Sequence, residues 1–255
     1  MSTTERMPAD APAPAPAIEA RGLTKRYSTL TAVDALDLSI ARGELFALLG
    51  TNGAGKSTTI GMLTGVRRPT KGDARIMGDS IVTQTAQAKA HLNVSPQETA
   101  VASRLSVREN IALIAGLYGQ PRKKAQASAQ AQERAFGLQD VSRQRAATLS
   151  GGMQRRLSIA MSMASNPEVL FLDEPTVGLD VYARHELWDA IEKLKGNVTI
   201  LLTTHYMGEV EALADRVGVM DSGKLIASGT VEDLERRTKT TTLEDAFLAL
   251  TGGGR

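Results

Sequence analysis

Glycine, lysine and hydroxyl residues are concentrated in one short segment, FALLGTNGAGKSTTIGML, at residues 46–63. Gly50, Gly53 and Gly55 lack the Cβ atoms that keep a ligand away from the backbone, and the flanking patterns predict a buried strand before them and a helix after them. A G-x-x-x-x-G-K-[ST] pattern in that context is typical of a phosphate site, because backbone N–H groups and the helix dipole both favour an anion. Lys56 would reach the outer phosphates, and Ser57 would supply an oxygen to Mg²⁺.

Two adjacent carboxylates follow another apolar run, in VLFLDEP at residues 169–175. A P-loop enzyme needs an acidic group at a neighbouring strand end to hold Mg²⁺, usually through water, and Asp173 fits that role. At a strand end Glu174 would point in a different direction from Asp173, so it could accept a proton from an attacking water as a general base. An Asp-Glu pair before proline is often only a polar strand exit, but behind an intact phosphate loop we interpret it as catalytic.

A second glycine-containing helix start lies in TLSGGMQRRLSIAMSMA, at residues 148–164. Ser150 is predicted to be the N-cap, and Gly151 and Gly152 leave the N–H groups of the first turn exposed. Two anion-binding helix ends this far apart in the chain suggest that one phosphate group is held from two sides. Taken alone, the segment also fits an ordinary glycine-rich helix start.

Strands and helices must position these residues, and the sequence pattern predicts an α/β fold with a mostly parallel sheet. Helical stretches separate many of the short apolar runs, as in such folds. One early run alternates apolar and polar residues, which predicts an antiparallel β part. The apolar runs lie at residues 32–40 (the alternating one), 45–49, 74–77, 92–94, 169–172, 198–202 and 217–220.

Between residues 106 and 148 the pattern becomes helical. Ser106 and Glu109 are spaced as a capping box, and a second helix is predicted from Pro121. We therefore expect a helical subdomain at about residues 98–165, inserted in a nucleotide-binding domain at residues 18–240. The Ala/Pro-rich residues 1–17 are predicted to be a disordered tail, and a C-terminal helix and tail are expected at residues 241–255.

Composition excludes several classes of protein. The 255 residues include 30 basic and 28 acidic side chains without a concentrated basic stripe, so no nucleic-acid partner is expected. Cysteine is absent, which excludes disulfides, thiolate catalysis and cysteine-ligated zinc. No apolar run approaches the ~18–20 residues of a membrane helix, so any membrane role is expected to come through a partner.

The order of these motifs resembles that of the ATP-binding-cassette (ABC) ATPases along nearly the whole chain from Ile18. LSGGMQ is similar to the signature motif of that family, residues 50–58 to its Walker A loop, and residues 169–174 to Walker B. Thr51 stands where proline is usual, at a position that demands no side-chain chemistry. The segment at residues 178–180 resembles the D-loop, and the remaining matches are Gln97 (Q-loop), His205 (switch histidine) and Tyr27 (the aromatic that stacks on adenine).

The resemblance implies a P-loop NTPase of the ABC-ATPase fold, in which two chains hold two ATP molecules head to tail. Each ATP would lie between Walker A of one chain and the signature motif of the other. The expected catalytic residues are Glu174, His205, Lys56 and Gln97, and the expected Mg²⁺ ligands are Ser57, Gln97 and Asp173. The expected nucleotide-binding residues are Tyr27, Gly50, Thr51, Asn52, Gly53, Ala54, Gly55, Lys56, Ser57, Thr58, Ser150, Gly151, Gly152 and Asp180.

Two further segments indicate which subfamily the chain resembles. TTLEDAFLALTGGG at residues 241–254 and SPQETAVASRLSVRENIALIAGLYG at residues 95–119 are similar to segments of ABC-2-type exporters, including the drug-resistance group. We therefore expect an ATPase subunit that pairs with a second copy of itself or a paralogue and drives a separately encoded membrane permease from the cytoplasmic face of the cell membrane. The alternative is a soluble ABC ATPase without a transport role, such as an iron–sulfur assembly or ribosome-associated ATPase.

Overall fold

Two β-sheets organise the computed structural model of the chain, which describes residues 15–252. Most of the predicted N-terminal tail, residues 1–14, lies outside the described residues. The strands are β1 (Ile18–Tyr27), β2 (Leu30–Ile40), β3 (Leu45–Leu49), β4 (Lys71–Ile76), β5 (Asp79–Ser80), β6 (Leu92–Ser95), β7 (Val169–Asp173), β8 (Thr199–Thr204), β9 (Arg216–Asp221) and β10 (Lys224–Gly229). The helices are α1 (Lys56–Leu63), α2 (Thr85–Ala90), α3 (Val107–Leu117), α4 (Arg122–Ala135), α5 (Gly151–Met163), α6 (Val181–Glu192), α7 (Met207–Leu213), α8 (Val231–Thr238) and α9 (Leu243–Thr251), with a 3₁₀ turn at Ala146–Thr148.

The larger sheet has six strands in the order β10-β9-β3-β8-β7-β6, and all its neighbours are parallel except the β9–β10 pair. The predicted mostly parallel sheet is therefore confirmed. Every residue of β3 and β8 is buried, which explains their continuous apolar runs, because parallel sheets are covered on both faces. The carboxyl ends of β3 and β7 lie on either side of β8, and ligands bind at this edge in open α/β sheets.

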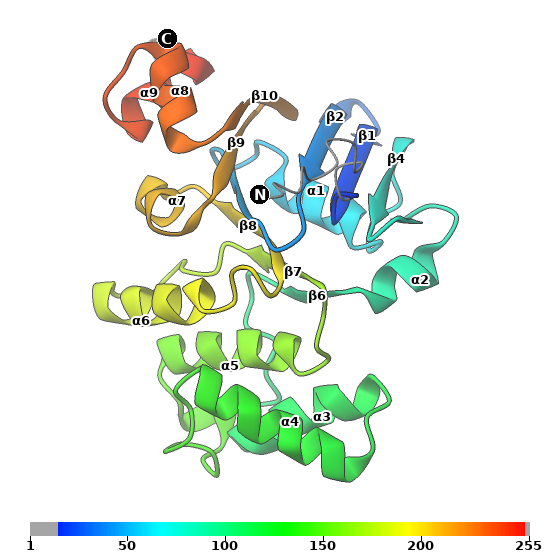
Figure 1. Cartoon of the computed structure of the whole chain (residues 1–255), viewed down its shortest axis with the longest axis vertical. Coiled ribbons are helices and arrows are strands. Elements are labelled where there is room, and N and C mark those ends of the chain that lie inside the picture. Colours follow the sequence, from blue (N-terminus) through cyan, green and yellow to red (C-terminus); the bar gives the residue numbers. More distant parts are fainter. Residues whose placement is uncertain (1–14, 253–255) are drawn as a thin grey trace, which may run out of the picture.

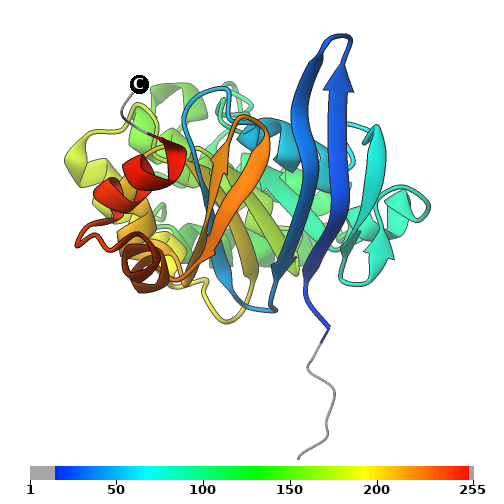
Figure 2. The ribbon, with the colours of Figure 1, turned by 90° about the horizontal axis from the view of Figure 1, so that it is seen from above.

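The smaller sheet is antiparallel, in the order β2-β1-β4-β5 (Figure 2). The alternating run at residues 32–40 falls in β2, as predicted, and β2 pairs with β1 from Ile18↔Ile40 to Tyr27↔Leu30. Ala17 was predicted to belong to the tail, but it is buried and donates its N–H to the carbonyl of Ile40 (2.9 Å).

Two apolar clusters cover the faces of the larger sheet. One joins α1 and the smaller sheet to side chains such as Phe46 and Phe171, and the other joins alternate strand residues such as Leu45 and Leu170 to α3 to α7 and α9. Figure 1 shows α3, α4 and α5, which fall within the helical insert predicted at about residues 98–165, grouped at one end of the molecule. α1, which follows the phosphate loop, is thus fixed between two sheets.

Local sequence signals set several helix ends. Ser106 and Glu109 form both bonds of the predicted capping box at α3, and Pro121 is the N-cap of α4. Thr242 caps α9 by accepting from the N–H of Asp245 (3.1 Å). Among the described helices, none is long and apolar enough to cross a membrane.

Candidate functional site

The phosphate loop connects β3 to α1 in a conformation that requires glycine. Gly55 is the N-cap of α1 with φ of 105°, a value that L side chains rarely adopt. A Cβ at Gly55 would lie 2.5 Å from the carbonyl oxygen of Ala32 in β2. The absence of a side chain therefore lets the smaller sheet approach the start of α1, whose first N–H groups are the donors that an anion needs.

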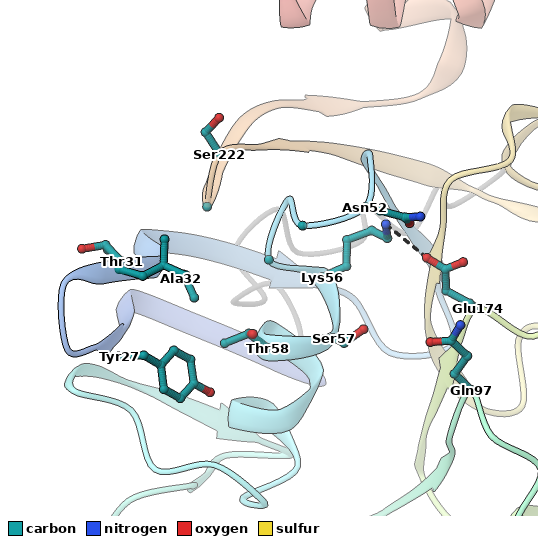
Figure 3. A pocket seen from close by; sticks show the side chains of 14 residues that line it. Tyr27, Thr31, Ala32, Asn52, Lys56, Ser57, Thr58, Gln97, Glu174 and Ser222 are labelled. Atoms are coloured by element: carbon teal, nitrogen blue, oxygen red, sulfur yellow. Dashed lines mark ion pairs between the residues drawn. The ribbon is translucent and has the colours of Figure 1, made fainter.

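Lys56 occupies the first position of α1 and is 4% exposed. Its Nζ donates to the carbonyls of Gly50 (2.7 Å) and Thr51 (3.2 Å), and it lies 3.2 Å from Oε1 of Glu174. Figure 3 shows Lys56 directed across the pocket toward that carboxylate. The chain thus places its buried ammonium group between the phosphate loop and the end of β7.

Ser57 and Asp173 provide a donor set that fits Mg²⁺. The Ser57 hydroxyl donates to Oδ1 of Asp173 (3.2 Å), and the Thr203 hydroxyl donates to the same oxygen (2.5 Å) and fixes its position. A hydroxyl and a carboxylate from two neighbouring elements leave the other ligand positions to water and phosphate oxygens, which is how Mg²⁺ is usually bound.

Glu174 follows the last residue of β7 and adopts an unusual backbone conformation. Its φ is +47°, and non-glycine residues in this left-handed region are often strained and occur at functional sites. Its N–H donates to the backbone carbonyl (3.0 Å) and the hydroxyl (3.1 Å) of Thr203, and its Oε2 lies 2.6 Å from Nδ1 of His205. Glu174 is 7% exposed, so its carboxylate is held between His205 and Lys56 in a site with little water.

Lys56, Ser57 and Glu174 line one side of a pocket of about 760 Å³. Gln97 lies beside Glu174 at this end, and Tyr27 lies at the other end (Figure 3). Near Tyr27 the pocket is also formed by residues that motif reasoning did not identify, because they come from the start of β2 and from the β9–β10 turn. The complete lining is Tyr27, Leu30, Thr31, Ala32, Asn52, Gly53, Gly55, Lys56, Ser57, Thr58, Gln97, Glu174, Ser222 and Gly223.

Several predicted site residues lie outside this lining. Ser150 caps α5 by accepting from the N–H of Met153 (3.3 Å), and Asp180 caps α6 by accepting from Ala183 (2.8 Å), so both occupy other helix starts of the same chain. His205 reaches the site through Glu174 and lines a small neighbouring pocket with Gly50, Thr51, Asn52, Met207 and Phe247. Gly50, Thr51, Ala54, Gly151, Gly152 and Asp173 are also absent from the lining of the large pocket.

Arg155 on α5 is a component of the site that motif reasoning missed. It is 4% exposed and donates to the carbonyls of Pro175 (2.8 Å) and Asp173 (3.0 Å) on one side, and of Pro96 and Gln97 (3.3 Å) on the other. Burial lowers the pKa of Arg155 to about 10. Its guanidinium therefore ties the segments that carry Gln97 and Asp173 to α5. No local sequence pattern distinguished Arg155 from the adjacent Arg156.

Comparison with known proteins agrees with this geometry. Residues 33–177 match the sequence model of the family described as ABC transporter. The daunorubicin/doxorubicin resistance ATP-binding protein DrrA of Streptomyces peucetius is 42% identical over 223 residues, which are 87% of this chain and 68% of that protein. The Nod factor export ATP-binding protein I of Ralstonia nicotianae is 40% identical over 226 residues, which are 86% of this chain and 68% of that protein.

Solved structures of similar fold include further subunits of ABC transporters. An ATP-binding subunit of an ABC transporter aligns with a TM-score of 0.81 and 27% identity, covering 91% of this chain and 98% of that one. CbiO1 of Clostridium perfringens, described as part of the ABC transporter complex cbiONQ, aligns with a TM-score of 0.79 and 25% identity, covering 87% and 91% of the two chains.

Proposed function

The chain belongs to the ABC transporter family of ATPases, and from that premise we propose that it is the ATP-hydrolysing subunit of an exporter whose membrane-spanning part is a separate protein. The observation that carries the proposal is the position of Glu174, between Lys56 and His205 and at one end of a pocket whose other end is formed by Tyr27. The relative named for Nod factor export supports the direction of transport.

In this proposal the pocket binds ATP with the adenine against Tyr27 and the phosphates along residues 50–58. Lys56 and the N–H groups at the start of α1 hold the outer phosphates. Mg²⁺ would be held by Ser57, Asp173 and Gln97 and would neutralise charge on the phosphate oxygens. Glu174 accepts a proton from the attacking water, and His205 orients the Glu174 carboxylate and contacts the γ-phosphate.

A second copy of the chain completes the site. Ser150, Gly151 and Gly152 form the exposed start of α5 and do not line the pocket of their own chain, so we infer that they bind the γ-phosphate held by the other chain. Asp180, at the start of α6, would help to organise the two sites across the interface. A paralogous ATPase subunit could take the place of the second copy.

The helical insert is the proposed contact with the membrane partner. Leu113, Leu117 and Tyr118 at the end of α3 are 46%, 73% and 50% exposed, more than is usual for large apolar side chains. Docking there would hold the subunit at the cytoplasmic face of the membrane. A soluble ABC ATPase without a transport role is the second candidate, and the transporter relatives disfavour it.

Complementation between two variants tests the shared site. Ser150→Arg should leave nucleotide binding by the monomer intact but block ATP-dependent dimerisation, because the new side chain fills the anion site at the start of α5. Lys56→Ala should bind ATP weakly, through loss of a charge-assisted contact. Mixing the two variants puts both lesions in one site and leaves the other site intact, so ATP-dependent association should return. Gel filtration with Glu174→Gln in both chains, which stops turnover, is the measurement.

Ala127→Arg provides a matched control. Ala127 is exposed on α4, and the hydroxyl of its neighbour Ser128 donates to the carbonyl of Ala164, at the opposite end of α5 from Ser150. This variant adds the same charge and should dimerise with ATP as the parent does. If Ser150→Arg also dimerises like the parent, the head-to-tail arrangement is wrong.

A further inference from the structure

Arg67 lies beside the nucleotide pocket but belongs to none of the motifs that define the site. It follows α1 in the loop that leads to β4. Its Nη1 donates to the phenolic oxygen of Tyr27 (3.1 Å) and to the hydroxyl of Thr58 (3.3 Å). Both acceptors line the pocket, and Figure 3 shows their side chains at the same end of it. One guanidinium group therefore connects β1, which carries Tyr27, to α1, which follows the phosphate loop.

A backbone hydrogen bond and a glycine place the side chain of Arg67 against α1. The N–H of Arg67 donates to the carbonyl of Gly61 (2.7 Å), which fixes the start of the side chain. A Cβ at Gly61 would lie 2.8 Å from Cδ of Arg67, so glycine at this position leaves space for the side-chain stem. Glycine in a helix interior is unfavourable relative to alanine, and here it serves the close approach of Arg67.

Lys25 of β1 lies over the ring of Tyr27 and is itself bonded to the same loop. Nζ of Lys25 lies 5.1 Å from the ring centroid and donates to the backbone carbonyl of Arg68 (2.7 Å). Tyr27 is 41% exposed, so its own packing does not fix the ring. The bond from Arg67 to the phenolic oxygen fixes the position of the far end of the ring relative to α1, and with it the distance between the base and the phosphates of a bound nucleotide.

We propose that Arg67 is a positioning residue for the nucleotide base, acting through Tyr27. The inference rests on the proposed ATP site and adds a determinant of base recognition to it. It predicts that Arg67 strengthens binding of ligands that carry the base and has little effect on ligands that carry only phosphates. It also predicts an effect on KM rather than kcat, because Glu174 lies at the other end of the pocket.

Equilibrium binding of ATP and of inorganic triphosphate to Arg67→Ala tests the proposal. Base–aromatic stacking and a charge-assisted hydrogen bond both contribute modestly at exposed sites, so we expect the Kd for ATP to rise about 3- to 10-fold. The Kd for triphosphate should stay within about 2-fold, and the KM for ATP should rise at an unchanged kcat. Arg67→Lys, which keeps a single donor group, should recover part of the affinity.

A double-mutant cycle with Tyr27→Phe separates positioning from a general charge effect. In the Tyr27→Phe background the Arg67→Ala change should lose most of its effect on ATP, because the acceptor has gone. Arg68→Ala is the matched control, since Arg68 offers its backbone carbonyl to Lys25, and this variant should bind ATP like the parent. Equal weakening of ATP and triphosphate, or an unchanged Kd for both, would overturn the proposal.

Lys56→Ala separates this proposal from the proposed function. It should weaken both ATP and triphosphate, because Lys56 contacts the phosphates. If Lys56→Ala binds both ligands like the parent, the phosphate site itself is misplaced. If it weakens both and Arg67→Ala changes neither, the ATP site stands and only the role of Arg67 fails.

Discussion

Replacing Arg155 with methionine should destabilise the fold by about 2–4 kcal/mol, an estimate that combines two opposing effects. Burial lowers the pKa of Arg155 to about 10, which corresponds to a net cost of roughly 3 kcal/mol that methionine would not carry. Against this, methionine leaves the carbonyls of Pro96, Gln97, Asp173 and Pro175 without their donor. The lost bonds to Pro175 and Asp173 cost about 1–3 kcal/mol each, and those to the exposed residues Pro96 and Gln97 cost about 0.5–1.5 kcal/mol each. The middle of this range, about 6 kcal/mol in all, exceeds the relief of desolvation by about 3 kcal/mol.

Urea denaturation of Arg155→Met against Arg156→Met measures this difference. Arg156 is the next residue on α5, and its guanidinium pairs with Glu186 (3.2 Å), whose side chain is 59% exposed. Such a pair is worth at most about 1 kcal/mol, and Nη1 of Arg156 also donates to the carbonyl of Phe136 (3.4 Å). Arg156→Met should therefore lower the free energy of unfolding by about 1–2 kcal/mol, less than Arg155→Met does. Equal stabilities of the two variants would refute the assignment of Arg155 as the link between α5 and the site.

Two further predictions concern Glu174 in the site and His91, which precedes β6 at the edge of the larger sheet. Glu174→Gln should retain ATP binding and lose at least about 100-fold in turnover, since an amide cannot accept the proton, and a parental rate of phosphate release would place the base elsewhere. Burial lowers the pKa of His91, but its hydrogen bonds to Glu168 and Asp79 outweigh burial and leave the pKa above 6.5. The stabilising contribution is therefore full below about pH 6.5 and is lost as pH rises through the folded-state pKa. His91→Gln should reduce the free energy of unfolding more at pH 6 than at pH 9, and equal losses at both pH values would contradict this.

Structural features that are specified by residues close together in the sequence were predictable. The phosphate loop, the strand ending in Asp173, the Ser150 cap and the Ser106–Glu109 capping box each fall within a few residues, and hydrophobic pattern or side-chain chemistry specifies them directly. The apolar runs at residues 45–49 and 169–172 could be recognised as strands because both faces of a parallel sheet are buried.

The end of the pocket near Tyr27 was not predictable, because it forms where three distant segments meet. Gly223 donates its N–H to the carbonyl of Ala54 (3.0 Å) and accepts from the N–H of Asp34 (2.8 Å) through its own carbonyl. The β9–β10 turn, the β1–β2 hairpin and the phosphate loop therefore fix one another. None of these contacts has a local signature, and β10 itself was missed because its short polar sequence, KLIASG, lacks a strong strand pattern.

In the proposed mechanism, the position of Lys56 would link nucleotide binding to activation of Glu174 as the base. In this structure its buried ammonium group is satisfied by two loop carbonyls and by Oε1 of Glu174. A triphosphate in the loop would offer Lys56 several negatively charged oxygens in place of one carboxylate oxygen, so the ammonium group would turn toward the ligand and release Oε1. The other oxygen of Glu174 would remain bonded to His205, which keeps the carboxylate oriented while Oε1 becomes free to accept a proton. The base would thus be released by the binding of the substrate on which it acts, and the strained backbone at Glu174, with φ of +47°, holds its carboxylate where Lys56 can make that exchange.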